Sequence, residues 1–350
     1  MAKVLVLFSG SLASRIAGTL ARRHPDVTSV QLLHFRSPFA SEGEELRDLV
    51  RDDWAGTMLR TQSLKREYRR FIESNEDGFS LHAACMQCRA LLMARSARYM
   101  ERVGADFIMT GERLGRHGLG CEELEWLTET LGVEGRVLRP LCHRAPLEGT
   151  SLTEWGRLSG SRSLRTAKDV DLAEWAAELG LEPSNSLGSG VRCKLTLPGF
   201  GERVASLFAE ESFTLNGLRL LDFAHYYNVE PGTKVVLAID EEEKRELQNL
   251  FLPQDLRVYP STPHGPMALV RADWEERTEA EQRQILEVAA CIVATHACGG
   301  RASTVPIYYR LESDDETLLV NARALGSVEG LSEIPGVRGM ALLMPEPASA

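Results

Sequence analysis

Long apolar runs are missing from this sequence. No stretch of the 350-residue chain reaches the roughly eighteen consecutive apolar residues that a membrane helix requires. A secretory leader is not expected either, because the first apolar run, residues 4–8, is short and no small-residue cleavage site follows it. We therefore expect a cytoplasmic protein with no membrane segment.

Cysteine and basic charge are also scarce. The seven cysteines are unevenly spaced, which excludes a disulfide-stapled scaffold. The net charge of −10 is local, because residues 1–203 carry +1 and residues 204–350 carry −11. An acidic total argues against a general nucleic-acid-binding protein. The nearly neutral first part still leaves room for a local basic face.

The first half of the chain alternates strand-like and helix-like patterns. Residues 3–8 predict a buried strand, 14–23 an amphipathic helix and 27–35 a second strand, which together form a βαβ unit with parallel strands. Further segments continue this alternation: a charged helical pattern over 41–72, a helix over 88–103, strands over 106–110 and 137–141, and a surface helix over 170–179. The fold class expected is α/β with a doubly wound parallel sheet.

A second, smaller α+β domain follows. Residues 184–201 are rich in Gly, Ser and Pro and predict an irregular segment, either a domain boundary or an active-site loop. After it we expect strands over 234–239 and 304–311 and helices over 241–250 and 278–298. The predicted domains are 1–208 and 211–330, with a loose tail over 340–350.

One short loop combines small and hydroxylated residues. Ser9, Gly10, Ser11 and Ser14 lie between the first strand and the first helix, at the edge where doubly wound sheets bind ligands. Small residues let backbone N–H groups approach an anion, and the helix N-terminus favours negative charge. The pattern therefore predicts phosphate binding. The alternative is that Ser14 is simply the helix N-cap.

This loop and several later segments resemble one family. Residues 4–14 resemble the PP-loop of ATP pyrophosphatases, Ser-Gly-Gly-x-Asp-Ser, and the chain resembles proteins related to the tRNA 4-thiouridine sulfurtransferases. The supporting segments occur in family order: Leu33-His34-Phe35, Cys85-Met86-Gln87-Cys88, residues 104–112, Leu138-Arg139-Pro140-Leu141, Gly160-Ser161-Arg162-Ser163 and residues 188–196. The resemblance implies an adenine nucleotide alpha hydrolase-like fold over residues 3–208.

The resemblance also implies an activity. Such enzymes cleave ATP to AMP and pyrophosphate with Mg²⁺, activate a carbonyl oxygen such as that of a tRNA uridine, and let sulfur displace AMP. Two residues depart from the family pattern, since Ser11 replaces Gly and Ala13 replaces Asp. The Cβ and hydroxyl of Ser11 narrow the space in which a phosphate can approach the backbone. Ala13 lacks the carboxylate that is expected to help organise the metal ion and the phosphates. These changes leave the fold expectation intact and weaken the ATPase expectation.

Three cysteines are candidate functional thiols. Cys85 and Cys88 have the spacing of two metal ligands, and Cys193 in the Gly/Ser-rich segment is a candidate third. They resemble the set that holds an iron–sulfur cluster in some thiolation enzymes of this superfamily. The alternatives are a sulfur carrier with its resolving thiol, or ordinary buried cysteines. The remaining cysteines are predicted to be structural: Cys121, Cys142, Cys291 and Cys298.

Basic residues supply candidate ligand contacts. Arg162 and Lys194 lie in Gly-flanked, loop-like segments and are predicted to contact nucleotide or RNA phosphates. Arginines recur between residues 89 and 102, where a solvated helix face is the favoured interpretation. Residues 234–311 loosely resemble the RNA-associated module of fibronectin-binding-like ribosome quality-control proteins, with a generic interaction module as the alternative. His264 and His296 are predicted to be structural or exposed to solvent.

Two functions follow from these observations. The first is an ATP-dependent tRNA-thiolation-type enzyme that uses ATP, tRNA and a sulfur donor protein. Ser9, Gly10, Ser11, Ser14, Arg162 and Lys194 would contact the nucleotide. Cys85, Cys88 and Cys193 would handle sulfur or hold a cluster. The alternative, suggested by Ser11 and Ala13, is a catalytically degenerate PP-loop protein that binds nucleotide, RNA or protein.

Overall fold

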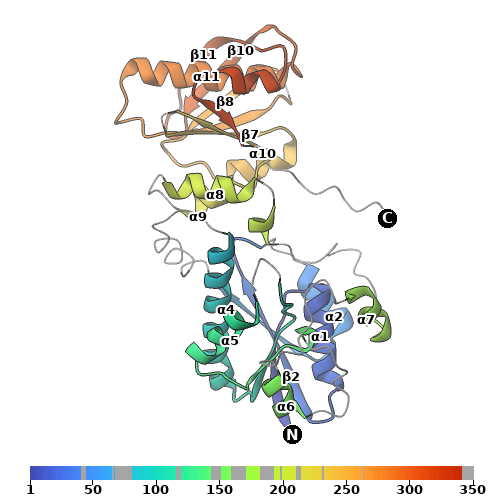
Figure 1. Cartoon of the computed structure of the whole chain (residues 1–350). Coiled ribbons are helices and arrows are strands. Elements are labelled where there is room, and N and C mark those ends of the chain that lie inside the picture. Colours follow the sequence, from blue (N-terminus) through green and yellow to red (C-terminus); the bar gives the residue numbers. More distant parts are fainter. Residues whose placement is uncertain are drawn as a thin grey trace. The chain divides into compact units, whose positions relative to one another are not determined.

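The computed structural model describes most of the chain. The described residues are 1–40, 45–64, 67, 81–115, 120–142, 151–158, 171–181, 193–197, 199–209, 214–230, 232–262 and 264–340. They form two compact units, Met1–Thr196 and Leu197–Ala350 (Figure 1). The sequence placed the domain boundary between 208 and 211, whereas helix α8 (Phe200–Ala209) groups with the second unit. The reason is Arg203, whose buried guanidinium donates, among the described residues, to carbonyls of that unit alone.

The first unit is built on a parallel sheet. Its five strands have the order β3-β2-β1-β4-β5, and every neighbouring pair is parallel. The strands are β1 Ala2–Leu7, β2 Val27–Arg36, β3 Met58–Ser63, β4 Phe107–Met109 and β5 Val137–Leu138. Because all strands run the same way, their carboxyl ends meet at one edge of the sheet. We call this edge the carboxyl rim.

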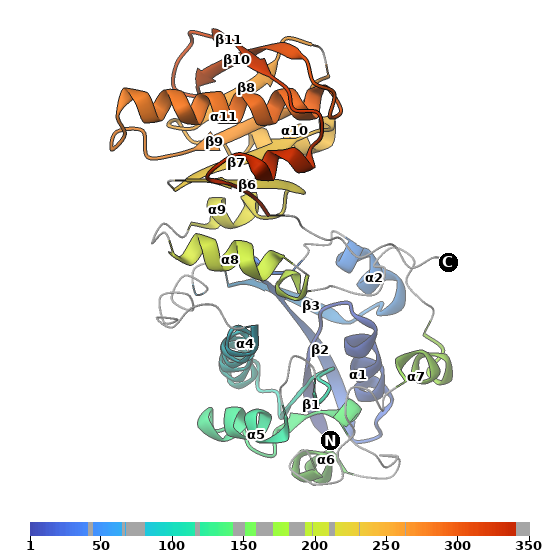
Figure 2. The same ribbon diagram turned by 45° about the horizontal axis from the view of Figure 1, so that its top comes forward.

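Helices cover both faces of this sheet (Figure 2). The helices are α1 Leu12–Arg23, α2 Glu45–Asp53, α4 Leu81–Val103, α5 Cys121–Thr130, α6 Leu152–Leu158 and α7 Leu172–Glu178. On one face Val4 and Val6 pack with residues of α1, α2 and α6. On the other face Leu5 packs with residues of α4 and α5. Alternate β1 side chains thus serve two cores, which confirms the doubly wound α/β prediction.

Two predicted helices have different limits in the structure. The helical pattern over 41–72 was too long, because α2 ends at Asp53 and Met58 begins strand β3. Trp54 closes α2 and is fully buried against Phe8, so the apolar spacing continued past the last helical residue. Helix α4 starts at Leu81 instead of residue 88, which places Cys85 and Cys88 inside the helix and not before it.

The second unit contains a seven-stranded sheet in which every pair is antiparallel. Its order is β11-β10-β8-β9-β7-β6-β12. The strands are β6 His225–Val229, β7 Thr233–Ala238, β8 Leu256–Pro260, β9 Met267–Arg271, β10 Thr304–Leu311, β11 Leu318–Arg323 and β12 Val337–Gly339. The long helix α11 (Glu279–Ala297) packs its apolar side on one face. The prediction that the second domain belongs to the α+β class is therefore confirmed.

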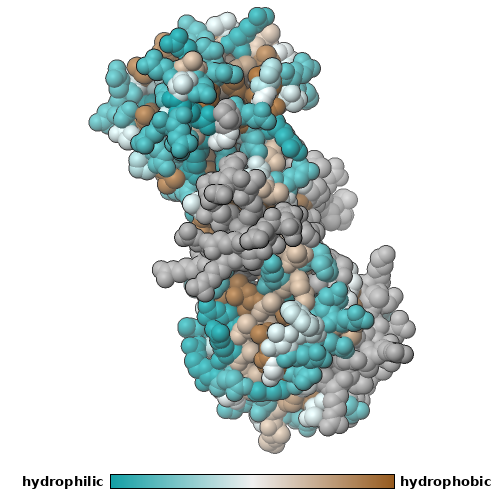
Figure 3. Space-filling view, turned by 60° about the vertical axis from the view of Figure 1, so that its left-hand side comes forward, coloured by the Kyte–Doolittle hydropathy of each residue, from teal (hydrophilic) through white to brown (hydrophobic). Residues whose placement is uncertain are grey.

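The helices of the second unit start at local capping residues. Thr278 and Glu281 form a reciprocal capping box at the start of α11. Asp240 caps α10 (Glu241–Gln248), and Thr214 caps α9 (Leu215–Leu220). In Figure 3 the visible face of this unit is mainly hydrophilic, with apolar residues scattered among polar ones. Among the described helices of the whole chain, none is both long and apolar enough to cross a membrane.

Candidate functional site

The predicted phosphate loop lies at the carboxyl rim, directly after β1. Gly10 has a φ of +80°, a left-handed conformation that glycine adopts without strain. Ser11 is the N-cap of α1, and its hydroxyl accepts a hydrogen bond from the Ser14 N–H group. The helix therefore begins two residues earlier than predicted. Ser14 belongs to its first turn, so the N-cap interpretation of Ser14 is wrong.

Three hydroxyl groups of this loop converge. The Ser9 hydroxyl lies 3.0 Å from that of Ser11 and 3.4 Å from that of Ser14. The Ser14 hydroxyl also donates to the Ser11 carbonyl at 2.9 Å. Within the described part of the chain, the N–H groups of Gly10, Leu12 and Ala13 donate no hydrogen bond. Gly10 and Ala13 are buried. Buried amides without acceptors are costly, so an anion that accepts from them would stabilise the loop.

The segment that follows β4 contacts this loop through Gly111. A Cβ built on Gly111 would lie 2.6 Å from the Ala13 carbonyl carbon and 2.7 Å from the Ser14 nitrogen. Any larger residue would therefore displace the first turn of α1. This close approach places the residues on either side of Gly111, Thr110 and Glu112, beside the phosphate loop.

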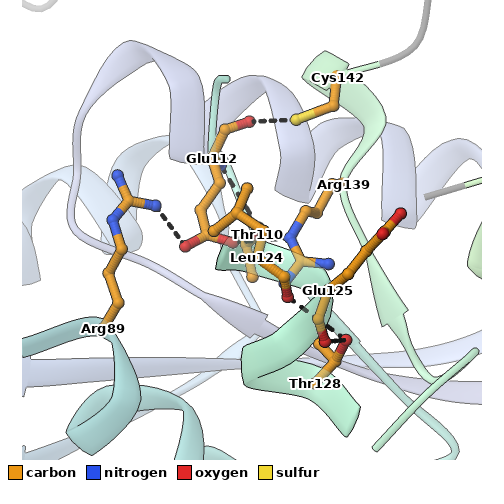
Figure 4. Close-up of polar contacts among 8 residues, drawn as sticks. All are labelled: Arg89, Thr110, Glu112, Leu124, Glu125, Thr128, Arg139 and Cys142. Carbon is orange, nitrogen blue, oxygen red and sulfur yellow. Dashed lines mark hydrogen bonds and ion pairs between the residues drawn. The ribbon is translucent and has the colours of Figure 1, made fainter. Parts of the chain in front are cut away.

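Glu112 is the centre of a buried ionic network (Figure 4). Its carboxylate accepts from Arg89 at 2.5 Å and from Arg139 at 2.9 Å, and Thr110 donates to it at 3.2 Å. The Cys142 thiol donates to the Glu112 carbonyl at 3.3 Å. The side chains of Arg89 and Arg139 are only 15% and 3% exposed. We call these five residues the Glu112 cluster.

The two arginines keep Glu112 ionised. Burial alone would raise the pKa of Glu112, but the charges and hydrogen bonds of Arg89 and Arg139 outweigh it and lower the pKa to about 2. Burial and the nearby Glu112 charge raise the pKa of the Cys142 thiol to about 12. The cluster is thus charged at its centre and carries a protonated thiol at its border.

The sequence interpretation of Arg89 was wrong. Its helix face was expected to be solvated, and Arg98 and Arg102 of the same helix are indeed exposed. Arg89 instead faces the carboxyl rim and is neutralised there. Arg139 directly follows β5 and Glu112 follows β4 by three residues, so adjacent parallel strands bring both to one rim. That pairing of strand ends is the signal that could have found this cluster.

Cys85 and Cys88 lie one turn apart in the first half of α4, and both are partly buried. Arg89, four residues after Cys85, hydrogen-bonds to the Cys85 thiol as well as to Glu112. A guanidinium fixed by the Glu112 cluster therefore stands beside the Cys85 sulfur. Both cysteines lie beyond the first turn of the helix, and the partial positive charge of a helix N-terminus acts mainly within that first turn.

Cys193 and Lys194 lie beside the segment that follows β2. Cys193 forms an isolated antiparallel bridge with Ala40, and the Lys194 N–H donates to the Phe39 carbonyl at 2.7 Å. Phe39 is buried, so this contact ties the later loop to the first sheet. Arg162 lies outside the described residues.

The three candidate thiols do not fit a metal cluster as they lie. Within the described residues, which include all seven cysteines, no group of three or more His, Cys, Asp or Glu side chains could hold a metal ion. The same residues form no disulfide. We therefore draw no chemical step through an iron–sulfur cluster.

A second polar cluster lies in the second unit. The Tyr227 hydroxyl lies 2.7 Å from Nε2 of His296, whose ring packs against that of His225 with centroids 4.7 Å apart. Burial, with the nearby His225, lowers the pKa of His296 to about 4, and burial raises that of Tyr227 to about 12. We call these three residues the histidine cluster. His296 is thus a structural residue and His264 is exposed, which are the two roles that the sequence predicted for them.

Comparisons with known proteins give only distant structural similarity. No family model matches the chain, and no curated protein matches its sequence. Solved structures of several proteins superpose on part of it. The predicted subunit of tRNA methyltransferase from Methanocaldococcus jannaschii is 14% identical, with a TM-score of 0.29, and the match covers 55% of this chain and 96% of that one.

The U34-tRNA thiolase NcsA from Methanococcus maripaludis, solved with its [4Fe-4S] cluster, is 13% identical. Its TM-score is 0.29, over 63% of this chain and 73% of that one. The C-terminal part of the fibronectin/fibrinogen-binding protein from Streptococcus suis is 10% identical. Its TM-score is 0.25, over 46% of this chain and 70% of that one. Similarity at this level defines no activity, so function is argued from the residues of this chain.

Proposed function

We propose that this chain is an ATP-dependent enzyme of the tRNA-thiolation type, or a close relative, with the phosphates of ATP at the Ser9–Ser14 loop. The observation that supports it is the loop itself. Gly10, Leu12 and Ala13 present N–H groups without acceptors in the described structure, beside three converging hydroxyls at the start of α1. Amides and hydroxyls in this arrangement suit a pyrophosphate leaving group.

The proposed reaction has two displacements. A carbonyl oxygen of the nucleobase attacks the α-phosphorus of ATP, and pyrophosphate leaves towards the loop. Sulfur then attacks the activated carbon, and AMP leaves. Cys85 would carry the sulfur as a persulfide received from a sulfur donor protein, next to the fixed charge of Arg89. The outer sulfur attacks the activated carbon of the tRNA base and AMP leaves; the Cys88 thiolate then attacks the Cys85 sulfur, which releases the thiolated tRNA and leaves a Cys85–Cys88 disulfide for an external thiol to reduce. Cys193 would be the third functional thiol. Lys194 and Arg162 would contact phosphates.

The loop offers few oxygen ligands to a magnesium ion bound to ATP. Mg²⁺ prefers octahedral oxygen ligands and usually keeps several waters. Ala13 brings no carboxylate to the loop, and Ser9, Ser11 and Ser14 are its only side-chain oxygens. An ATP-bound Mg²⁺ would therefore be held by phosphates, waters and these hydroxyls.

A second candidate function is nucleotide binding without turnover. The observation that favours it is the same residue, Ala13, where the resembling family has Asp. The hydroxyls of Ser9, Ser11 and Ser14 also hydrogen-bond to one another, so these three side chains have partners without a ligand. Such a protein would bind ATP, RNA or a protein and form no AMP.

The first test measures AMP formation. Purified protein under anaerobic conditions with ATP, Mg²⁺, tRNA and a persulfide-loaded sulfur donor protein should form AMP, and Ser14→Ala should reduce the rate because it removes a loop hydroxyl. Ser313→Ala, on the second unit, is the matched control and should change nothing. Absence of AMP from the native chain, with ATP binding retained in calorimetry, would select the second candidate.

A second test separates a working loop from a degenerate one. The double variant Ser11→Gly and Ala13→Asp restores the family pattern. AMP formation only in the double variant would show that the native loop binds without turnover. Sulfur transfer is tested by Cys85→Ala, which should abolish thiolation and leave adenylation in place. Cys298→Ala, outside the first unit, is its control.

A further inference from the structure

The second unit ends its sheet on an open strand edge. Strand β11 is the last strand of the order, and it pairs only with β10 within the described structure. The β10–β11 register places Thr304 opposite Arg323, and the Ala324 N–H donates to the Ser303 carbonyl at 2.7 Å. Because alternate residues of an antiparallel strand bond to opposite sides, residues 318, 320 and 322 bond towards β10. The N–H and C=O groups of Leu319, Asn321 and Arg323 therefore point to the open side.

This edge is apolar and exposed. Leu318 and Leu319 are 45% and 55% exposed, and they belong to the few large apolar residues of the described chain that are so accessible. Leu319 lies opposite Tyr308 on one face of the sheet, while Leu318 lies opposite Tyr309 on the face that α11 covers. Natural proteins normally protect such an edge with proline, lysine or a bulge. The sequence of β11, Leu-Leu-Val-Asn-Ala-Arg, contains neither proline nor lysine, and its pairing with β10 has no bulge.

We propose that the open edge of β11 is the interface between two copies of this chain, which pair antiparallel about a two-fold axis through Leu319. In this register Leu319 lies opposite Leu319 of the second copy, and Leu318 lies opposite Val320. Asn321 lies opposite Thr317, and Arg323 lies opposite Asp315. Leu318, Leu319 and Val320 each gain an apolar neighbour, and Asn321 and Arg323 each gain a polar or charged one. The small Ala322 lies opposite Glu316.

Charge favours a second copy over an unrelated strand. The edge is acidic at its beginning, where Asp314, Asp315 and Glu316 are exposed, and basic at its end, where Arg323 is exposed. An antiparallel copy brings the basic end of each strand to the acidic end of the other, twice by symmetry. A parallel copy would place like charges together. Moving the axis to Val320 would put Leu319 opposite Asn321 and Arg323 opposite Thr317, which loses both the apolar and the ionic matches.

The experiment is sedimentation velocity on the full chain, from low-micromolar to several-hundred-micromolar concentration. The native chain should show a concentration-dependent dimer. Asn321→Pro should sediment as a monomer, because it removes an N–H group on the open side and leaves the β10 ladder intact. Asn321→Thr is the matched control and should dimerise as the native chain does. Circular dichroism of each variant checks that the sheet has folded.

Charge reversal tests the register. Arg323→Glu or Asp315→Arg alone should weaken the dimer by about tenfold, because each places like charges opposite one another at two symmetric positions. The double variant should recover the native dissociation constant. A native chain that remains monomeric throughout, a dimer that survives Asn321→Pro, or a double variant no better than the single ones would overturn the proposal.

Discussion

The Glu112 cluster and the histidine cluster both remove polar side chains from water, and they solve that problem in opposite ways. In the first unit Glu112 is buried as an anion, and two guanidinium groups compensate its charge. In the second unit Tyr227 is buried and His296 is partly buried, both as neutral groups joined by one hydrogen bond. We therefore expect the stability of the charged cluster to depend on every member. The stability of the neutral cluster should already depend on pH between 6.5 and 4.

The largest effect is expected from breaking the charged cluster. Glu112→Gln keeps the shape of the side chain but leaves Arg89 and Arg139 as uncompensated buried cations. The free energy of unfolding of the first unit should fall by about 3–5 kcal/mol, measured by urea denaturation. Glu101→Gln removes an exposed ion pair with Arg136 and should cost about 0–1 kcal/mol. Equal losses for the two variants would mean that Glu112 is not held as a buried anion.

The next effect comes from the contact that joins this cluster to the phosphate loop. Gly111→Ala drives a methyl group into the Ala13–Ser14 peptide, which is backbone and cannot rotate away. We expect a loss of about 1–3 kcal/mol in the first unit and weaker ATP binding by calorimetry. Gly326→Ala meets no atom within 4 Å and should be neutral. An alanine variant as stable as the native chain would show that the Ala13–Ser14 peptide does not lie against Gly111.

The third prediction separates the clusters by pH. The ordinary pKa of histidine is 6.5, and that of folded His296 is about 4, so the unfolded chain binds a proton first as pH falls. The second unit should lose about 1–2 kcal/mol between pH 6.5 and pH 4, less than the full shift because His296 is partly exposed. The contribution of Glu112 persists above pH 4.5 and is lost only between pH 4.5 and about 2.

Hydrogen exchange of peptides from α11 would measure this loss locally. His296→Gln should flatten the decline between pH 6.5 and 4, whereas His264→Gln, at an exposed position, should leave it unchanged. If the native chain shows no decline in that range, the histidine cluster is not buried in its neutral form.

The smallest effect concerns the hydrogen bond inside the histidine cluster. Tyr227→Phe removes the hydroxyl that contacts His296 and should cost about 1 kcal/mol at neutral pH in thermal unfolding. The pH decline should remain, because burial of the imidazole is its main cause. A variant that removes the decline as well would assign the pH response to the hydroxyl instead.

Much of the fold could be predicted because its signals are local. The buried run before Ser9, the apolar face of α1 and the second buried run identify the βαβ unit without any long-range information. The limits of α2 and α4 were not predicted well. Trp54 extends the helical spacing beyond α2 because a residue after the helix is also buried. The start of α4 at Leu81 was missed because the cysteine pair was interpreted as preceding the helix, although Ala83 and Ala84 favour helix.

The candidate site was only partly predictable for a related reason. The phosphate loop lies between consecutive elements, so its position at the rim follows from chain order. The Glu112 cluster joins α4, the segment after β4 and the end of β5. Glu112 is 23 residues from Arg89 and 27 residues from Arg139 in the sequence. Helix periodicity cannot distinguish an arginine that faces water from one that faces a buried carboxylate. Arg89 was therefore assigned to the wrong environment.

One side chain of the second unit has a consequence for shortening the chain. Arg203 donates to the carbonyls of Leu221, Phe223, Ala224 and Met340, and burial lowers its pKa to about 10. Deleting residues 341–350 keeps all four acceptors, so the melting temperature should hardly change. Cutting one residue further removes the Met340 carbonyl, one of the four acceptors of this buried cation, and should lower the melting temperature. The shortest stable form of this protein is therefore expected to end at Met340, and Arg203 sets that limit from 137 residues away.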